Sequence, residues 1–256
     1  MRKRWKWHVP PGIRHGGETL EGSAILDEVE GGEGLLLWQL LRDVTLWSTA
    51  GDVAAREALF SSDAAGGRRR AIAELSADSA LLRVLSPLAG LLENPGGAAV
   101  RPVGIAANAI SRWAEENDLA ATALYYAQAA ALAEEESPAA ALRVAMLART
   151  RGARAHAESW YRRTIGLARQ GEDWDAYAEA YLGMGALYAE RDRAGSAEEL
   201  YRRALRAARR HSLHPLEERA RAALRALSGE MSAHAAAAEG VVQAEPAASR
   251  LLPEAG

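Results

Sequence analysis

The chain has 256 residues, of which 49% are hydrophobic and 25% charged, and its formal net charge is −3. Such a balance is typical of a folded protein with one large domain or two small ones. It contains no cysteine, which excludes disulfide bonds, thiolate zinc sites and cysteine nucleophiles. No stretch is long and apolar enough to predict a membrane-spanning helix, and the basic start lacks the apolar run of a signal peptide, so we expect a cytoplasmic protein.

Residue usage predicts the fold class. Alanine, leucine, arginine and glutamate, all strong helix formers, are abundant, whereas there is a single phenylalanine. This usage favours helix over strand throughout and predicts an all-α protein. The only two lysines are Lys3 and Lys6, and this preference for arginine is typical of GC-rich bacterial genomes.

The first 34 residues predict little stable structure. Residues 1–17 carry basic side chains and no acid, residues 18–33 carry acidic side chains and no base, and pairs of proline and glycine interrupt both halves. Only Ser23–Val29 suggests a short helix, with Ser23 as its N-cap. We therefore expect a poorly ordered, basic-then-acidic segment over residues 1–34.

Residues 35–97 predict an atypical helical N-terminal region. Its first helix, Leu35–Ser48, carries apolar residues on two adjoining stripes, which implies burial from more than one side. Three more helices are expected, over Asp52–Phe60, over Arg68–Leu75 after a break at Gly66-Gly67, and over Asp78–Leu92. Asn94-Pro95-Gly96-Gly97 is a strong stop signal. These helices can be read as two degenerate hairpins.

A helical-hairpin signature follows. In chain order it consists of Tyr181, Met184, Gly185, Tyr188, Ala197, Tyr201 and Ala204. The small pair Gly185 and Ala197 allows two antiparallel helices to approach closely, while the tyrosine rings fill the groove beside that contact. The same register recurs earlier in the chain, at Trp160 and Tyr161 and, in a weaker form, at Trp113 and Tyr126.

The pattern resembles the tetratricopeptide repeat (TPR), a two-helix unit that stacks on copies of itself. The intervals between equivalent tyrosines are 161 − 126 = 35 and 201 − 161 = 40 residues, against a family repeat of about 34. A longer second helix or loop is therefore expected near residues 170–175. The resemblance implies a right-handed α-α superhelix over residues 98–228, with about three hairpins and a capping helix. Residues 229–256 are expected to form a disordered tail.

In TPR proteins the first helix of each hairpin lines a concave groove. Among the residues that the resemblance places in this groove, we take seven as candidate binding residues: Asn108, Ser111, Arg143, Met146, Arg149, Leu182 and Ala186. Asn108 followed by Arg143 is similar to part of the carboxylate clamp of chaperone-binding TPR domains, but the lysine positions of the clamp are not matched. We expect Arg143 and Arg149 to form an exposed fork on the concave face, beside the apolar Met146.

The sequence contains none of the common motifs of enzyme active sites. The sequence has no phosphate-binding or dinucleotide-binding glycine motif and no known hydrolase or zinc-protease motif. We expect no catalytic residue, no cofactor and no metal. The favoured function is a non-enzymatic adaptor or scaffold that binds a protein or peptide, of unknown identity, in the groove. The alternative is a regulatory module that contacts nucleic acid through Arg4, Trp5, Lys6 and Trp7. We consider nucleic acid the less favoured partner, since this segment can equally dock on a protein, on a membrane surface or on the chain's own helices.

Overall fold

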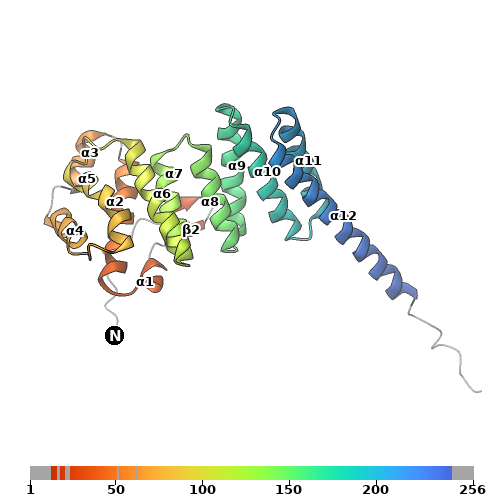
Figure 1. Ribbon diagram of the computed structural model, residues 1–256, viewed down its shortest axis with the longest axis horizontal. Helices are drawn as coiled ribbons and strands as arrows, with labels where there is room; N and C mark the ends of the chain where they lie inside the picture. The colour runs from red at the N-terminus through yellow and green to blue at the C-terminus, as the bar shows by residue number, and fades with distance from the viewer. Residues whose placement is uncertain (1–12, 16–17, 21–23, 51, 61–62, 244–256) are drawn as a thin grey trace, which may run out of the picture. The chain divides into compact units, whose positions relative to one another are not determined.

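The computed structural model describes residues 13–15, 18–20, 24–50, 52–60 and 63–243 (Figure 1). Within these ranges the protein is all-α, as predicted, with twelve helices and one ribbon of two three-residue strands. None of the helices in the described part combines the length and the apolarity needed to cross a bilayer. Contacts divide the chain into two units, residues 1–180 and 181–256.

The first unit begins with an antiparallel ribbon in which Ile13 pairs with Leu20. Its elements are β1 (Ile13–His15), β2 (Glu18–Leu20), α1 (Ile25–Glu28), α2 (Gly31–Thr49), α3 (Val53–Phe60), α4 (Asp63–Ala73), α5 (Ala80–Glu93), α6 (Val100–Glu116), α7 (Ala120–Ala133), α8 (Pro138–Thr150) and α9 (Arg154–Gln170). The boundary between the units lies inside α10 (Trp174–Ala189), and the second unit continues with α11 (Ala194–Arg210) and α12 (His214–Gln243).

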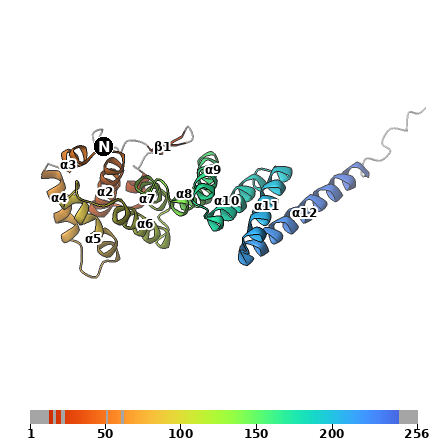
Figure 2. The same cartoon turned by 90° about the horizontal axis from the view of Figure 1, so that it is seen from above.

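The core of the N-terminal region is built around α2. This helix contacts α1, α3, α4, α6 and α7 (Figures 1 and 2). Its buried apolar residues are Leu36, Leu37, Trp38, Leu40, Leu41, Val44 and Trp47. The predicted burial from more than one side is thereby confirmed. Trp47 Nε1 also donates to Pro95 O (2.8 Å), so the predicted stop after α5 is held against α2.

A charged pair is buried beside this core. The Arg68 guanidinium on α4 contacts the Asp43 carboxylate on α2, and both residues are buried. Burial raises the pKa of the Asp43 carboxyl to about 6, although the neighbouring charges of Arg68 and Arg42 act in the opposite direction. The expected break at Gly66-Gly67 is wrong, because α4 begins at Asp63 and runs through both glycines. Arg68, the residue that follows these glycines, connects α4 to α2 through its ion pair with Asp43.

The acidic segment differs from the poorly ordered stretch that we expected. Ile25 on α1 is fully buried. The Glu28 carboxylate accepts hydrogen bonds from Ala121 N (2.5 Å), Thr122 N (2.8 Å) and Thr122 Oγ1 (2.9 Å). These groups lie at the first turn of α7, whose own N-cap, Leu119, makes no capping hydrogen bond and has no side-chain acceptor. Residues 1–12 and the predicted N-cap Ser23 lie outside the described residues.

One turn type recurs between the later helices. Five connections each place one residue in the left-handed region, namely Asp118, Gly152, Glu172, Asp192 and Ser212. The residue that follows donates its N–H to the carbonyl five positions back, at 2.8–3.1 Å, as in Leu119 N to Ala114 O. This is the Schellman arrangement, which satisfies carbonyls left open at a helix end. From Gly152 onward the turns come every 20 residues.

Helix length accounts for the uneven repeat spacing. α9 has 17 residues where α7 has 14, and α10 has 16 where α8 has 13. The prediction of a longer second helix is confirmed, while the connection between α9 and α10, residues 171–173, is no longer than its counterpart between α7 and α8, residues 134–137. The connection between α7 and α8 differs, because there Ser137 Oγ accepts from Ala140 N (3.2 Å) and Pro138 begins the helix.

Most of the predicted repeat-packing residues are buried. They are Tyr126, Trp160, Tyr161, Tyr181, Met184, Gly185, Ala197, Tyr201 and Ala204. Trp113 and Tyr188 are partly exposed. The neighbour of Gly185 is Tyr201: a Cβ at position 185 would come within 2.6 Å of the Tyr201 ring. Gly185 therefore makes room for a ring, whereas we expected it to meet Ala197.

α12 packs on α11, and its residues Leu216, Ala220 and Leu227 are buried. The helix continues to Gln243, beyond the expected start of a disordered tail at residue 229. Alanine supplies five of residues 231–243, and its high helix propensity accounts for the continuation. The rest of the predicted tail, residues 244–256, lies outside the described residues.

Candidate functional site

A cleft of about 350 Å³ lies in the first unit, between α6 and α8, with the C-terminal part of α7 contributing to its lining. Its lining residues are Gly104, Asn108, Arg112, Glu115, Ala130, Glu134, Ser137, Ala139, Ala140, Leu142, Arg143, Met146, Leu147 and Thr150. The residues from α6 recur every three or four positions, so they form one stripe along that helix. α6 and α8 are the first helices of consecutive hairpins, which is where the groove was predicted.

Within this cleft, the Arg143 side chain is hydrogen-bonded to two residues of α6. Its Nε and Nη2 groups donate to Ser111 Oγ at 3.2 and 3.0 Å, and Nη2 also donates to Glu115 Oε2 at 2.9 Å. Ser111 is fully buried and donates its own hydroxyl to Ala123 O at 2.7 Å. The Arg143 side chain is only 20% exposed. Arg143, which we expected to form an exposed fork with Arg149, is therefore bound to α6 and mostly shielded from solvent.

Glu134 and Asn108 offer acceptors elsewhere in the cleft. The Glu134 side chain lies against Gly104, since a Cβ at position 104 would come within 2.6 Å of Glu134 Cγ. Glu134 forms no side-chain ion pair or hydrogen bond with another described residue. Asn108 Oδ1 is buried and accepts no hydrogen bond in the described part of the chain. An acceptor left in this state costs about 1–3 kcal/mol, so a ligand that brings a donor would be favoured there.

The cleft also has an apolar side. Met146 is 47% exposed and stands beside Leu142 and Leu147 on α8. Thioether side chains adapt to varied apolar partners at low cost. The cleft thus combines carboxylate and amide oxygens, the bound guanidinium group of Arg143 and an adaptable apolar wall within one small volume.

Of the predicted groove residues, the structure brings Asn108, Arg143 and Met146 together in this cleft, with Ser111 buried beneath. Arg149 lies on α8 but is not among the lining residues. Leu182 and Ala186 lie on α10 in the second unit, where Leu182 is buried. The alternative contact segment, Arg4, Trp5, Lys6 and Trp7, lies outside the described residues.

Sequence reasoning missed the contribution of Gly104, Arg112, Glu134 and Ser137. Glu134 begins a run of three glutamates, a pattern that usually indicates a solvated helix end and not a binding site. A glycine inside an otherwise strong helical pattern, such as Gly104, is the one signal that could have pointed to a close approach by another group.

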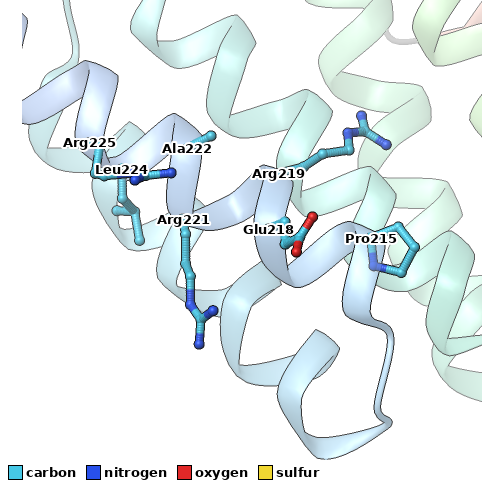
Figure 3. Close-up of a pocket in the computed structure, with 7 residues that line it drawn as sticks. All are labelled: Pro215, Glu218, Arg219, Arg221, Ala222, Leu224 and Arg225. Atoms are coloured by element: carbon cyan, nitrogen blue, oxygen red, sulfur yellow. The ribbon is translucent and has the colours of Figure 1, made fainter.

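A larger hollow, of about 910 Å³, lies along α12, and Figure 3 shows the residues that line it. All of them belong to α12: Pro215, Glu218, Arg219, Arg221, Ala222, Leu224 and Arg225. Arg219 and Arg221 point away from each other (Figure 3). Because a single helix supplies the lining and its charged groups do not converge, we favour the smaller cleft as the functional site.

A buried polar cluster joins α7 to α9 near the cleft. His156 Nε2 lies 2.5 Å from Gln128 Nε2 and 3.1 Å from Trp160 Nε1, which donates to it. His156 is fully buried, and its Nε2 accepts this indole hydrogen. In the described ranges no group of three or more histidine, aspartate or glutamate side chains is placed to hold a metal ion.

Comparison with protein-family models, curated proteins and solved structures returns no match for this chain.

Proposed function

We propose that the protein is a non-enzymatic, TPR-type adaptor that binds a protein or peptide in the cleft between α6 and α8. The helical hairpins would stack as a right-handed superhelix of the TPR kind. The observation that carries the proposal is the cleft itself, where three of the residues assigned to the groove by the TPR resemblance share one lining.

Two further observations support a repeat-based binding protein. The recurring Schellman turns give five of the six connections between α6 and α12 the same type, as expected when one structural unit is repeated. The exposed Met146 and the unpartnered Asn108 Oδ1 give the cleft both an apolar contact and a hydrogen-bond acceptor for an extended chain.

Site-specific photo-crosslinking tests the proposal. A photoreactive phenylalanine analogue placed at position 146 should form a discrete adduct with another protein in living cells. The same analogue at Arg162, an exposed position on α9 outside the cleft, serves as the matched control and should not form that adduct. Equal crosslinking from both positions, or none from position 146, would contradict the proposal.

A point variant gives an independent test. Met146→Asp should abolish co-precipitation of the crosslinked partner, because it places a charge on the apolar wall. It should change the free energy of unfolding by less than about 0.5 kcal/mol, since Met146 is exposed. A variant that retains the partner at parental levels would exclude the cleft as the binding site.

A further inference from the structure

We infer that the cleft selects peptides with a basic side chain, lysine or arginine, and that Glu134 and Asn108 receive this side chain. The inference rests on the proposed function and adds the chemistry of the ligand to it. It also differs from the carboxylate recognition that the pairing of Asn108 with Arg143 suggested in the sequence.

The first step concerns the hydrogen-bond acceptors of the cleft. Asn108 Oδ1 is buried and accepts no hydrogen bond from a described residue. Glu134 lies against Gly104, and Gly104 and Asn108 are one helical turn apart on α6, with side-chain positions about 5–6 Å from each other. A carboxylate that lies against Gly104 and an amide oxygen one turn away on the same face of α6 can both be reached by one ammonium or guanidinium group, which carries only donors.

The second step concerns the arginines of the cleft. Arg143 already donates to Ser111 and Glu115, so its charge is matched within the fold. Glu115 lies 11 residues beyond Gly104 on α6, about 16 Å along the helix axis. Arg112 lines the same cleft, and its backbone lies eight residues beyond Gly104, about 12 Å along the helix axis. The Gly104 end of the cleft therefore has a net acceptor character, with Glu134 as its unmatched charge.

The third step concerns the stem of the ligand side chain. Lysine and arginine carry three or four methylene groups, which gain from contact with an apolar surface while the charged head stays hydrated or paired. Leu142, Met146 and Leu147 supply such a surface within the same lining. A peptide with only acidic or neutral side chains would leave the Glu134 carboxylate without a cationic partner.

A displayed library of random peptides, selected on the full-length protein, tests the inference. We expect sequences with a lysine or arginine at one fixed position. Binding of a labelled selected peptide is then measured by fluorescence anisotropy. Glu134→Gln should weaken it at least tenfold, since charge-assisted hydrogen bonds are lost. Gly104→Ala, which displaces the Glu134 side chain without removing its charge, should also weaken it. Glu135→Gln, at an exposed neighbouring carboxylate that does not line the cleft, should have no effect.

The peptide itself provides the double-mutant control. Replacing its basic residue by norleucine should reproduce the loss caused by Glu134→Gln, and the two changes together should cost no more than either alone. Selected peptides that lack a basic residue yet lose binding in Met146→Asp would overturn this inference and leave the peptide cleft intact. Equal effects of Glu134→Gln and Glu135→Gln would also overturn it. Failure to select any peptide that is sensitive to Met146→Asp would overturn both the inference and the proposed function.

Discussion

At the scale of single residues, the interior of the first unit contains one ion pair whose state depends on pH. Asp43 and Arg68 are both buried and in contact, and the buried hydroxyl of Tyr126 donates to Leu37 O at 2.6 Å nearby. Burial, with a smaller contribution from Asp43, raises the pKa of Tyr126, so its hydroxyl remains a donor. Desolvation raises the pKa of Asp43 by more than the neighbouring Arg68 and Arg42 lower it.

We predict that the contribution of Asp43 to stability decreases as the pH rises from about 4 to about 6. The folded pKa of about 6 lies above the ordinary 3.8, so in this range the folded state binds the proton more tightly than the unfolded state. The unfolding free energy of the parent relative to that of Asp43→Asn should fall by about 1–3 kcal/mol between pH 4 and pH 7. Urea titrations at four pH values measure it. Asp27→Asn, at an exposed site, should show no such trend, and a difference that rises with pH would contradict the prediction.

A second residue-scale prediction concerns Gly185. Gly185→Ala should lower the free energy of unfolding by about 1–3 kcal/mol, because the new methyl group would overlap the buried Tyr201 ring. Gly166→Ala is the matched control: no atom lies within 4 Å of its added Cβ, and removing a glycine from the interior of α9 should stabilise the protein by up to about 1 kcal/mol. Thermal unfolding distinguishes the two. Similar melting temperatures for both variants would mean that Gly185 does not face the ring.

At the scale of elements, the turns and one helix cap decide how the helices are arranged. Four of the five left-handed turn positions are occupied by residues other than glycine, namely Asp118, Glu172, Asp192 and Ser212. Such residues are strained in this backbone conformation. The turns nevertheless form at each position, because the adjoining helices bury their apolar faces only when the chain reverses there.

Glu172→Gly should therefore raise the unfolding free energy, by about 0.5–1 kcal/mol, since glycine adopts the left-handed conformation without a clash. Gly152→Ala, at φ +75° in the equivalent turn, should lower it by about 1 kcal/mol. Chemical denaturation of both variants measures the two effects. Opposite signs are expected, and a loss of stability in Glu172→Gly would show that the Glu172 side chain has a role that its exposed position does not reveal.

The long-range cap gives the fourth prediction. Glu28→Ala should cost about 1–2 kcal/mol, because it leaves three donors at the start of α7 without their acceptor. Asp27→Ala changes the adjacent, exposed acid and should cost less than about 0.5 kcal/mol. If both variants unfold at the same urea concentration, Glu28 does not cap α7 in solution.

The elements also show what sequence reasoning can and cannot predict. The apolar stripes of α2, the stop after α5 and the start of a helix at Asp52, whose carboxylate accepts from Ala55 N at 2.8 Å, all depend on residues a few positions apart, and all were predicted. Contacts between distant segments were not. Periodicity cannot show that an acid in the N-terminal segment caps α7, or that Glu115 binds Arg143, because nothing local specifies either partner.

At the scale of the whole molecule, local and distant contacts are unevenly distributed. The later helices pair with their neighbours in sequence, as α8 does with α9 and α11 with α12. The N-terminal region instead reaches across the chain: α1 and α2 both contact α7, and the hydrogen bond from Tyr126 to Leu37 spans 89 residues. The candidate cleft between α6 and α8 is therefore bordered by α7, the same helix that contacts α1 and α2 at the start of the chain.

The long sequence separation between α2 and α7 affects folding during synthesis on the ribosome. The apolar surface of α2 that packs on α7 has no partner until α7 has been made. At about 5–20 residues per second, the ribosome adds the intervening 89 residues in roughly 4–18 s. During that time the leucine- and tryptophan-rich face of α2 is available to chaperones or to other nascent chains, whereas the pairs α8–α9 and α11–α12 can close within moments of their own synthesis.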